Sequence, residues 1–201
     1  VLIKACHCQL FMKLSNLPFK KLRLDQQISI VLLGVMVAYV VSPYLAIPEA
    51  KAATLGATYV RLDRMAASTA TTGLVCATTP AGDTGTEGQV VVTFPTGFTV
   101  SGTATNWSVA TTSIPNGATA WPSIAQPSGD GEISGQSVTF PSGDLSAATL
   151  YCFRWTNTAA LTTSTAGNSK TGTIATQTSG DGALDSDTYA LAVQDDQVGV
   201  T

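Results

Sequence analysis

The stretch GLVCATT, Gly73 to Thr79, places a cysteine in a run where apolar and polar residues alternate. The stretch TLYCFRWTN, Thr149 to Asn157, places another cysteine in a run of the same kind. Alternation with a period of two residues is typical of a β-strand that turns one face toward a core. The two stretches therefore predict two strands, each with a cysteine on one face.

The role of Cys76 and Cys152 depends on which other residues accompany them. A cysteine nucleophile needs a nearby base, and a zinc site needs three or four Cys or His ligands. The only histidine is His7, which lies between Cys6 and Cys8 near the start of the sequence, with no fourth ligand beside them. We therefore predict a disulfide between Cys76 and Cys152, with no metal and no cofactor. Two separate buried thiols are the alternative.

The residues before position 53 predict a secretory signal peptide. Met12 opens a basic segment, an uncharged apolar run follows at 28–41, and the small-x-small site AKAA stands at 50–53. This is the order of a basic region, an apolar region and a cleavage site. We expect residues 12–52 to be the signal peptide, with an apolar helix and cleavage after Ala52, and residues 1–11 to come from translation upstream of the true start.

A retained membrane anchor is the alternative for this leader. Residues 28–47 are about as long as a bilayer-spanning helix requires. In that case the protein would contact a membrane only through the uncleaved signal segment.

The charge balance after the leader argues against a nucleic-acid partner. From Ala53 onward the chain has four basic and eleven acidic side chains, a formal charge of −7. Phosphate binding needs clustered Lys and Arg. The same residues include 30 threonines, which suit exposed strand faces because threonine is β-branched and compatible with water.

The pattern after residue 53 predicts an all-β fold, an immunoglobulin-like β-sandwich spanning residues 53–195. Gly, Pro, Asp and Ser separate eight candidate strands. The candidate strands are 57–65, 72–78, 88–94, 106–111, 135–140, 149–157, 170–178 and 187–193. In such a sandwich we expect the disulfide to join one sheet to the other near the core.

Two segments resemble each other within this domain. GQVVVTFPTGF at 88–98 and GQSVTFPSGDL at 135–145 both end a strand on Phe-Pro followed by Gly. Proline cannot continue a hydrogen-bonded ladder, so the repeat predicts strand ends. Residues 196–201 are interpreted as the start of a further strand or of a truncated next module, because an unpaired terminal strand is an aggregation liability.

Several of these motifs together resemble a known group of proteins. TYVRLDRM at 58–65, VTFPTGF at 92–98, NWSV at 106–109 and LYCFRWTN at 150–157 are similar to secreted, Thr-rich β-sandwich modules. Such modules occur in surface proteins of uncultured bacteria with small genomes, and the similarity spans about 55–200. The resemblance implies a bacterial cell-surface location, an immunoglobulin-like sandwich and a continuing C-terminal region, with no assigned activity.

Two sets of side chains are candidate binding residues. Asp181, Asp185 and Asp187 in SGDGALDSDT are candidate hard oxygen ligands for calcium, but the EF-hand spacing is missing and we favour a solvated Asp-Gly turn between strands. A second set, Trp107, Trp121 and Trp155, is a candidate sugar-stacking platform, although core packing is the commoner role of tryptophan in an alternating strand and is the interpretation we favour. Asn106-Trp107-Ser108 is a glycosylation sequon that we interpret as incidental.

These observations favour a non-enzymatic, secreted or cell-surface protein that acts as a structural or adhesive module. The alternative is a carbohydrate-binding module that uses exposed aromatic rings. The expected partners are other surface-protein modules or glycans. Exposure of the three tryptophans distinguishes the alternatives, because a platform leaves its rings in solvent.

Overall fold

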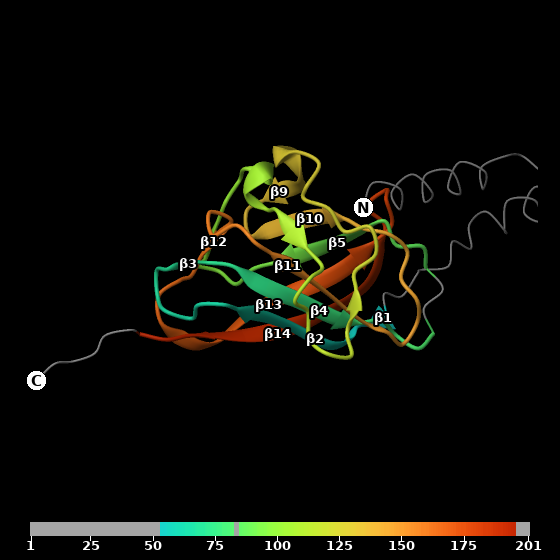
Figure 1. Ribbon diagram of the computed structural model, residues 1–201, viewed down its shortest axis with the longest axis horizontal. Helices are drawn as coiled ribbons and strands as arrows, with labels where there is room; N and C mark the ends of the chain where they lie inside the picture. Colours follow the sequence, from blue (N-terminus) through green and yellow to red (C-terminus); the bar gives the residue numbers. More distant parts are fainter. Residues whose placement is uncertain (1–52, 83–84, 196–201) are drawn as a thin grey trace, which may run out of the picture. The chain divides into compact units, whose positions relative to one another are not determined.

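The computed structural model describes residues 53–82 and 85–195, which form an all-β domain (Figure 1). The predicted signal helix within 12–52, the upstream segment 1–11 and the terminal segment 196–201 lie outside these residues. Within the described ranges, no helix has the length and apolar character needed to cross a membrane.

The larger sheet has six strands in the order β1-β14-β13-β5-β10-β9. Their bounds are β1 Ala53–Thr54, β14 Ala183–Val193, β13 Gly167–Gln177, β5 Gln89–Thr93, β10 Ser137–Pro141 and β9 Ile133–Ser134. β13 and β14 form a long antiparallel hairpin, whereas β1 runs parallel to β14 at the sheet edge. We call this sheet A.

The second sheet, sheet B, has the order β2-β4-β11-β7, and β8 also pairs with β11. The bounds are β2 Gly56–Leu62, β4 Gly73–Thr78, β11 Leu150–Trp155, β7 Val109–Ala110 and β8 Thr119–Ala120. β7 and β8 pair with opposite ends of β11, at Arg154–Trp155 and Tyr151–Cys152 respectively. The chain from β7 to β8 therefore passes beside sheet B.

A third, small sheet and two short helices complete the described part of the domain. The sheet has the order β3-β12-β6, with β3 Ala70–Thr71, β12 Leu161–Thr162 and β6 Thr99–Val100. The 3₁₀ helices are η2 Ala104–Asn106 and η3 Asp130–Glu132. Asp130 links them, because its carboxylate accepts a hydrogen bond from the Ala104 amide at 2.7 Å.

All eight predicted strands overlap strands of the structure, and the all-β prediction is confirmed. The strand expected at 106–111 shortens to β7, since η2 occupies 104–106 and Trp107 turns into the core. The two Phe-Pro segments prove to be neighbours. β5 and β10 pair antiparallel, and Phe94 and Phe140 are both buried.

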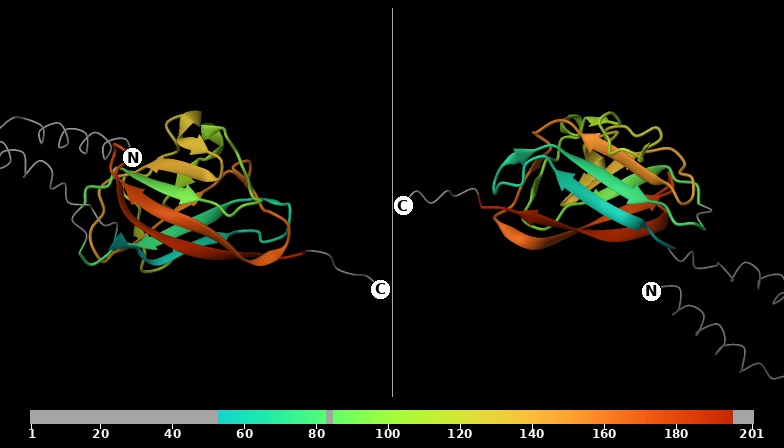
Figure 2. Two further views of the ribbon diagram at one scale, coloured as in Figure 1. Left: turned by 180° about the vertical axis from the view of Figure 1, so that it is seen from behind. Right: turned by 60° about the horizontal axis from the view of Figure 1, so that its bottom comes forward.

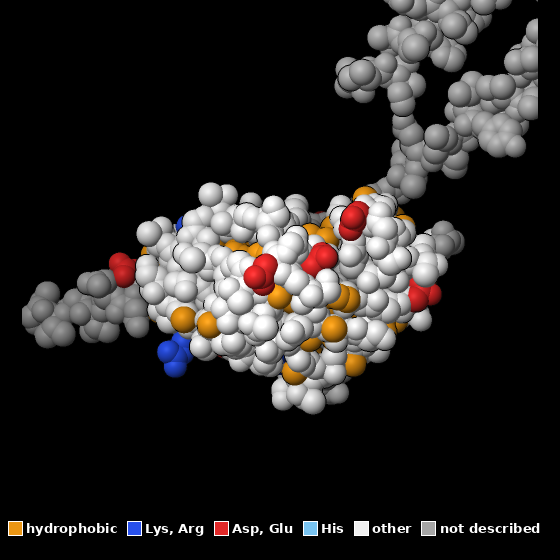
Figure 3. Space-filling view, turned by 90° about the horizontal axis from the view of Figure 1, so that it is seen from above, with side chains coloured by type: hydrophobic (Ala, Val, Ile, Leu, Met, Phe, Trp, Pro, Cys, Tyr) orange, Lys and Arg blue, Asp and Glu red, His pale blue; other side chains and the backbone are white. Residues whose placement is uncertain are grey.

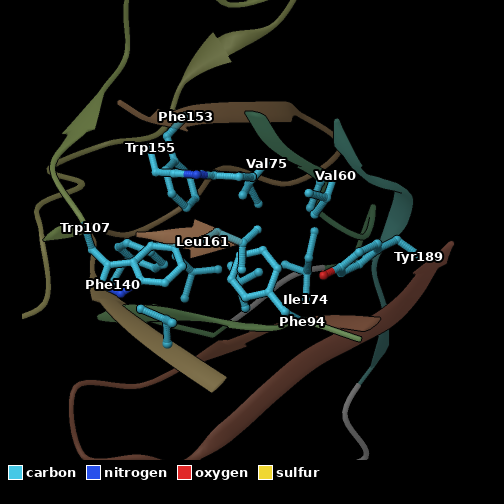
Figure 4. Close-up of a cluster of buried hydrophobic side chains, with 14 of the residues drawn as sticks. Val60, Val75, Phe94, Trp107, Phe140, Phe153, Trp155, Leu161, Ile174 and Tyr189 are labelled. Atoms are coloured by element: carbon cyan, nitrogen blue, oxygen red, sulfur yellow. The ribbon is translucent and has the colours of Figure 1, made fainter. Parts of the chain in front are cut away.

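The main core lies between sheets A and B, an arrangement consistent with a β-sandwich. Val60, Val75 and Phe153 enter it from sheet B, and Phe140 and Ile174 enter it from sheet A (Figure 4). Aromatic rings fill its middle. Phe94 lies 5.5 Å from Trp107 and 5.7 Å from Trp155 between ring centroids, both within the range for favourable aromatic contacts.

Gly73 allows the core to close around Trp155. The two residues are opposite each other on β4 and β11, and the indole lies over the glycine. A Cβ atom at position 73 would stand 2.2 Å from Cη2 of Trp155 and 2.5 Å from the Arg61 carbonyl oxygen. Both contacts are far shorter than van der Waals separation, so a side chain here would displace the indole or β2.

We predict that Gly73→Ala lowers the free energy of unfolding by about 1–3 kcal/mol, the usual cost of overpacking. Urea denaturation followed by tryptophan fluorescence measures this. Gly102→Ala is the matched control, because a Cβ at Gly102 meets no atom within 4 Å. Its effect should stay within about 0.5 kcal/mol. Equal effects of the two substitutions would contradict the packing argument.

Candidate functional site

The predicted pair of cysteines forms a disulfide, with Sγ atoms 2.04 Å apart and Cα atoms 4.3 Å apart. Cys76 and Cys152 are direct partners in the antiparallel pairing of β4 and β11. Such a short Cα separation is typical of the pair positions that exchange no backbone hydrogen bonds, where side chains come closest.

The expected position of this bridge was wrong, because it does not join the two sheets. Both cysteines belong to sheet B and form, with Leu74, a small buried cluster separate from the main core. Tyr59, Ile114, Ala118 and Leu150 pack against that cluster. Alternation shows which residues share a face, but it does not say which face points to the core. Here a loop covers the outer face as well.

We predict that Cys76→Ala/Cys152→Ala lowers the free energy of unfolding by about 2–5 kcal/mol, because the bridge closes a long loop. The bridge lies outside the main core, so the variant should keep the near-ultraviolet circular dichroism of its buried tryptophans at low temperature. Reduction of the wild-type protein should give the same loss of stability. A loss of the tryptophan signal before unfolding would contradict this arrangement.

The three tryptophans proposed as a platform are buried. Trp107, Trp121 and Trp155 have exposed fractions of 0%, 1% and 0%. The Nε1 atoms of Trp107 and Trp155 donate to the carbonyls of Ser101 and Thr71 at 2.9 and 3.0 Å. These rings fill the core, which agrees with the core packing that the sequence favoured and rules out an exposed stacking platform built from them. A tryptophan side chain has a large apolar area, and its burial contributes strongly to the stability of a core.

The three aspartates proposed for calcium have separate partners. Asp181 accepts a hydrogen bond from Gln89 Nε2 at 2.7 Å, and Asp185 accepts one from the Ala53 amide at 3.0 Å. Asp187 accepts one from the Thr58 hydroxyl. Across residues 53–82 and 85–195, no three Cys, His, Asp or Glu side chains gather as metal ligands. The structure thus does not bring the proposed calcium ligands together.

A charged cluster connects β11 with the end of β2. Arg154 forms an ion pair with Asp63, which also accepts a hydrogen bond from the Thr72 hydroxyl. Partial burial works to raise the pKa of Asp63, but the bonds from Thr72 and Arg154 and the charges of Arg154 and Arg61 lower it below 3.8. This partly buried pair joins the end of β2 to β11.

We predict that Arg154→Gln raises the pKa of Asp63, measured by NMR titration of its carboxyl carbon. A lowered folded-state pKa stabilises the fold above the unfolded value of about 3.9, and the effect is lost as pH falls through the folded value. The variant should be about 0.2–1 kcal/mol less stable at pH 6, and the difference should vanish near pH 2. A difference that persists at pH 2 would assign the effect to packing of the arginine stem.

A half-open pocket of about 480 Å³ lies where β14 ends. Its lining residues are Arg64, Met65, Ala66, Thr69, Gln194 and Asp195. Arg64 and Asp195 bring one charge of each sign, and none of the lining side chains is aromatic, so the pocket lacks a ring for stacking against a sugar. Met65, 43% exposed, is the large hydrophobic side chain that stands in solvent here.

A row of hydroxyl side chains crosses the outer face of sheet A. The register aligns Thr188 with Thr173, Thr173 with Thr93, Thr93 with Ser137, and Ser137 with Ser134. Residues opposite each other on neighbouring strands point to the same face. The row therefore spans five strands, and with a strand spacing of about 4.8 Å it is about 19 Å long. We call these five residues the hydroxyl row.

The hydroxyl row faces away from the core and is uncharged. Val92, Val138 and Ile174, which alternate with its members, are buried on the inner face. The next row along the strands, Ser186, Ala175, Val91 and Thr139, is also uncharged. β14, β13, β5 and β10 lie side by side on this face in the left panel of Figure 2. The face is thus broad and carries no charged side chain in either row.

Carboxylates lie elsewhere on the surface. In the view of Figure 3, acidic side chains stand apart from one another among uncharged ones, and Lys and Arg are seen only at the margin.

Sequence reasoning missed the hydroxyl row because it depends on register across five strands. The signal along the chain is short: hydroxyl residues stand two positions apart at Thr171 and Thr173 and at Ser137 and Thr139. The interpretation of the sequon at Asn106 as incidental stays a prediction. Asn106 Nδ2 donates to the Ser101 hydroxyl at 2.9 Å, so the amide already has a partner.

No protein-family model matches this chain, and no curated protein shows significant similarity to it. The resemblance to Thr-rich surface modules stays a prediction.

Proposed function

We propose that this protein is a non-enzymatic, secreted or cell-surface β-sandwich module with a structural or adhesive role. The observation that carries the proposal is the hydroxyl row on the outer face of sheet A. Every member of the row is partly or fully exposed, whereas a loop packs on the corresponding face of sheet B. The two broad faces of the domain are therefore unequal, and sheet A offers the one for contact with a partner.

The chemistry of the hydroxyl row suits adhesion. Threonine is stiff at χ1, so little side-chain entropy is lost when a partner orders it. Each hydroxyl both donates and accepts, which allows it to match varied polar groups. Thr93 and Ser137 already pair through their hydroxyls at 2.8 Å, which fixes the middle of the row. No charge has to be desolvated when this face is covered.

The strand arrangement supports an immunoglobulin-like module. β2, β4 and β11 lie in one sheet and β14, β13, β5 and β10 in the other, and the first strand runs parallel to the last at an edge. The disulfide departs from the antibody pattern, because it joins neighbours within a sheet instead of bridging the two. The signal peptide predicted at 12–52 and this disulfide both fit an oxidising, extracytoplasmic location.

Other surface-protein modules are the partners that this face fits best. A flat row of hydroxyls can lie against a second sheet face, and the absence of charge avoids repulsion between acidic domains. Glycan binding is the second candidate, since hydroxyls hydrogen-bond to sugars. Burial of the three tryptophans removes the stacking rings that most favoured it.

We predict that Thr188→Lys reduces retention of the secreted protein on isolated cell envelopes of the producing organism by about tenfold or more. An unpaired ammonium buried in an interface costs well over the 1.4 kcal/mol that corresponds to a factor of ten. Sedimentation of envelopes with the purified protein measures retention. Thr158→Lys, also at an exposed threonine, is the matched control and should change retention less than twofold.

A glycan array separates the two partner classes. Silence on the array together with loss of retention in Thr188→Lys supports contact with protein modules. Array binding that Thr188→Lys abolishes assigns the same face to glycans. Equal retention of wild-type protein, Thr188→Lys and Thr158→Lys would overturn the role of the hydroxyl row.

A further inference from the structure

The amide nitrogen of Ala53 lies against a buried carboxylate. It donates a hydrogen bond to Oδ1 of Asp185 at 3.0 Å, and Asp185 is only 6% exposed. Ala53 is also the residue that follows the predicted cleavage site of the leader, AKA at 50–52. The atom held by Asp185 is therefore the atom that leader removal would convert into the amino terminus.

The surroundings hold this nitrogen in a fixed place. β1 runs parallel to β14 with Ala53 opposite Asp185, and Leu55, two residues on, is 1% exposed in the core. The Leu55 amide contacts the Ser186 carbonyl at 3.4 Å. On the other side, the Asp185 amide donates to the Thr176 hydroxyl on β13 at 3.2 Å. Both partners of the contact are thus anchored, whereas Ala53 itself is exposed.

We propose that removal of the leader creates an ion pair between the new α-ammonium of Ala53 and the buried carboxylate of Asp185. The inference rests on the secreted location in the proposed function. Water hydrolyses the Ala52–Ala53 peptide bond, with a leader peptidase as catalyst. The carboxyl group leaves with Ala52, and the amino group left on Ala53 takes up a proton. A neutral amide donor becomes a cation with three donor hydrogens.

The site suits a cation better than a neutral amide. Hydrogen bonds between two ionised groups are about twice as strong as neutral ones, and low exposure weakens solvent screening. A second carboxylate, Asp187, follows on the same face of β14, where Thr58 of β2 donates to it. The other titratable residues of the strands next to β14 lie apart from Asp185. Lys170 of β13 is opposite Leu191, toward the other end of β14. Tyr59 and Arg61 of β2 pair with Cys76 and Leu74 of β4.

Two nearby carboxylates should raise the pKa of the α-ammonium above its ordinary value of about 7.7–8.0. A group with a raised folded-state pKa stabilises the fold below its unfolded pKa, and the effect is lost as pH rises through the folded value. The ion pair is therefore present in full at pH 6 and disappears in strongly alkaline solution.

The experiment uses the full chain, expressed with its leader and recovered from the medium. Intact mass and amino-terminal sequencing identify the first residue. After Ala53 the chain has one lysine, Lys170, so the secreted protein carries only two amines. Reductive ¹³C-methylation labels both, and NMR titration then gives the pKa of each. Lys170 serves as the internal reference.

We expect the pKa of the α-amine in the wild-type protein to lie clearly above the ordinary value of about 7.7–8.0, and that in Asp185→Asn to return to it. Asp195→Asn, which neutralises an exposed carboxylate just beyond β14, is the matched control and should leave the value unchanged. At pH 6 the Tm of Asp185→Asn should fall by roughly 3–8 °C relative to Asp195→Asn, and the gap should close at high pH. Should Asp185→Asn fail to fold, the titration of the wild-type protein decides alone.

The outcomes separate this inference from the proposed function. A secreted protein that begins at a residue other than Ala53 overturns the ion pair but leaves the adhesive role standing. A secreted protein that begins at Ala53 with an ordinary α-amine pKa does the same. A protein that retains its leader and stays with the cell overturns both the ion pair and the secreted location.

Discussion

The contact between Trp155 and Gly73 is the constraint on which the rest of this domain depends. The indole lies over the glycine of the neighbouring strand, and its Nε1 donates to the Thr71 carbonyl, so its position is fixed by shape and by a hydrogen bond. Phe94 and Trp107 then pack against it from the segments that follow β5 and lead into β7. Because interiors are close-packed, one ring held in this way sets the separation of the two sheets.

Strand positions could be predicted from the sequence because each is set by a local pattern. β4, β5, β10 and β11 alternate in polarity or end at Gly and Pro, and such signals need no knowledge of the rest of the chain. The side of the sheet on which Cys76 lies could not be predicted in this way. All residues of β4 from Gly73 to Ala77 are buried, since the core covers one face and the loop before β8 covers the other. Alternation loses its meaning for a strand buried on both faces.

The same limit explains why the surroundings of the candidate binding residues could not be predicted. Trp107 follows a short 3₁₀ helix, where no period of two operates, and its burial depends on a loop that returns to the core. Asp181, Asp185 and Asp187 are close in sequence, but a turn residue and a strand pair project their carboxylates toward different partners. The hydroxyl row has the opposite character, because its members are far apart in sequence and only the register of sheet A aligns them.

The contact at Ala53 lies at the edge of sheet A, where it helps to cover strand β14. β14 is 11 residues long, and the segment 53–67 touches its outer edge at both ends: β1 pairs with Asp185 and Ser186, and Ala66 forms a bridge with Gln194. Between these points the chain leaves as β2 to join sheet B, which passes close to β14. An exposed strand edge is a template for pairing with another chain, and adhesive modules meet one another at high local concentration. A charge at Ala53 would strengthen one of the two attachments of this cover. The edge of β14 would then be best covered after the leader has been removed, when the secreted protein meets other modules.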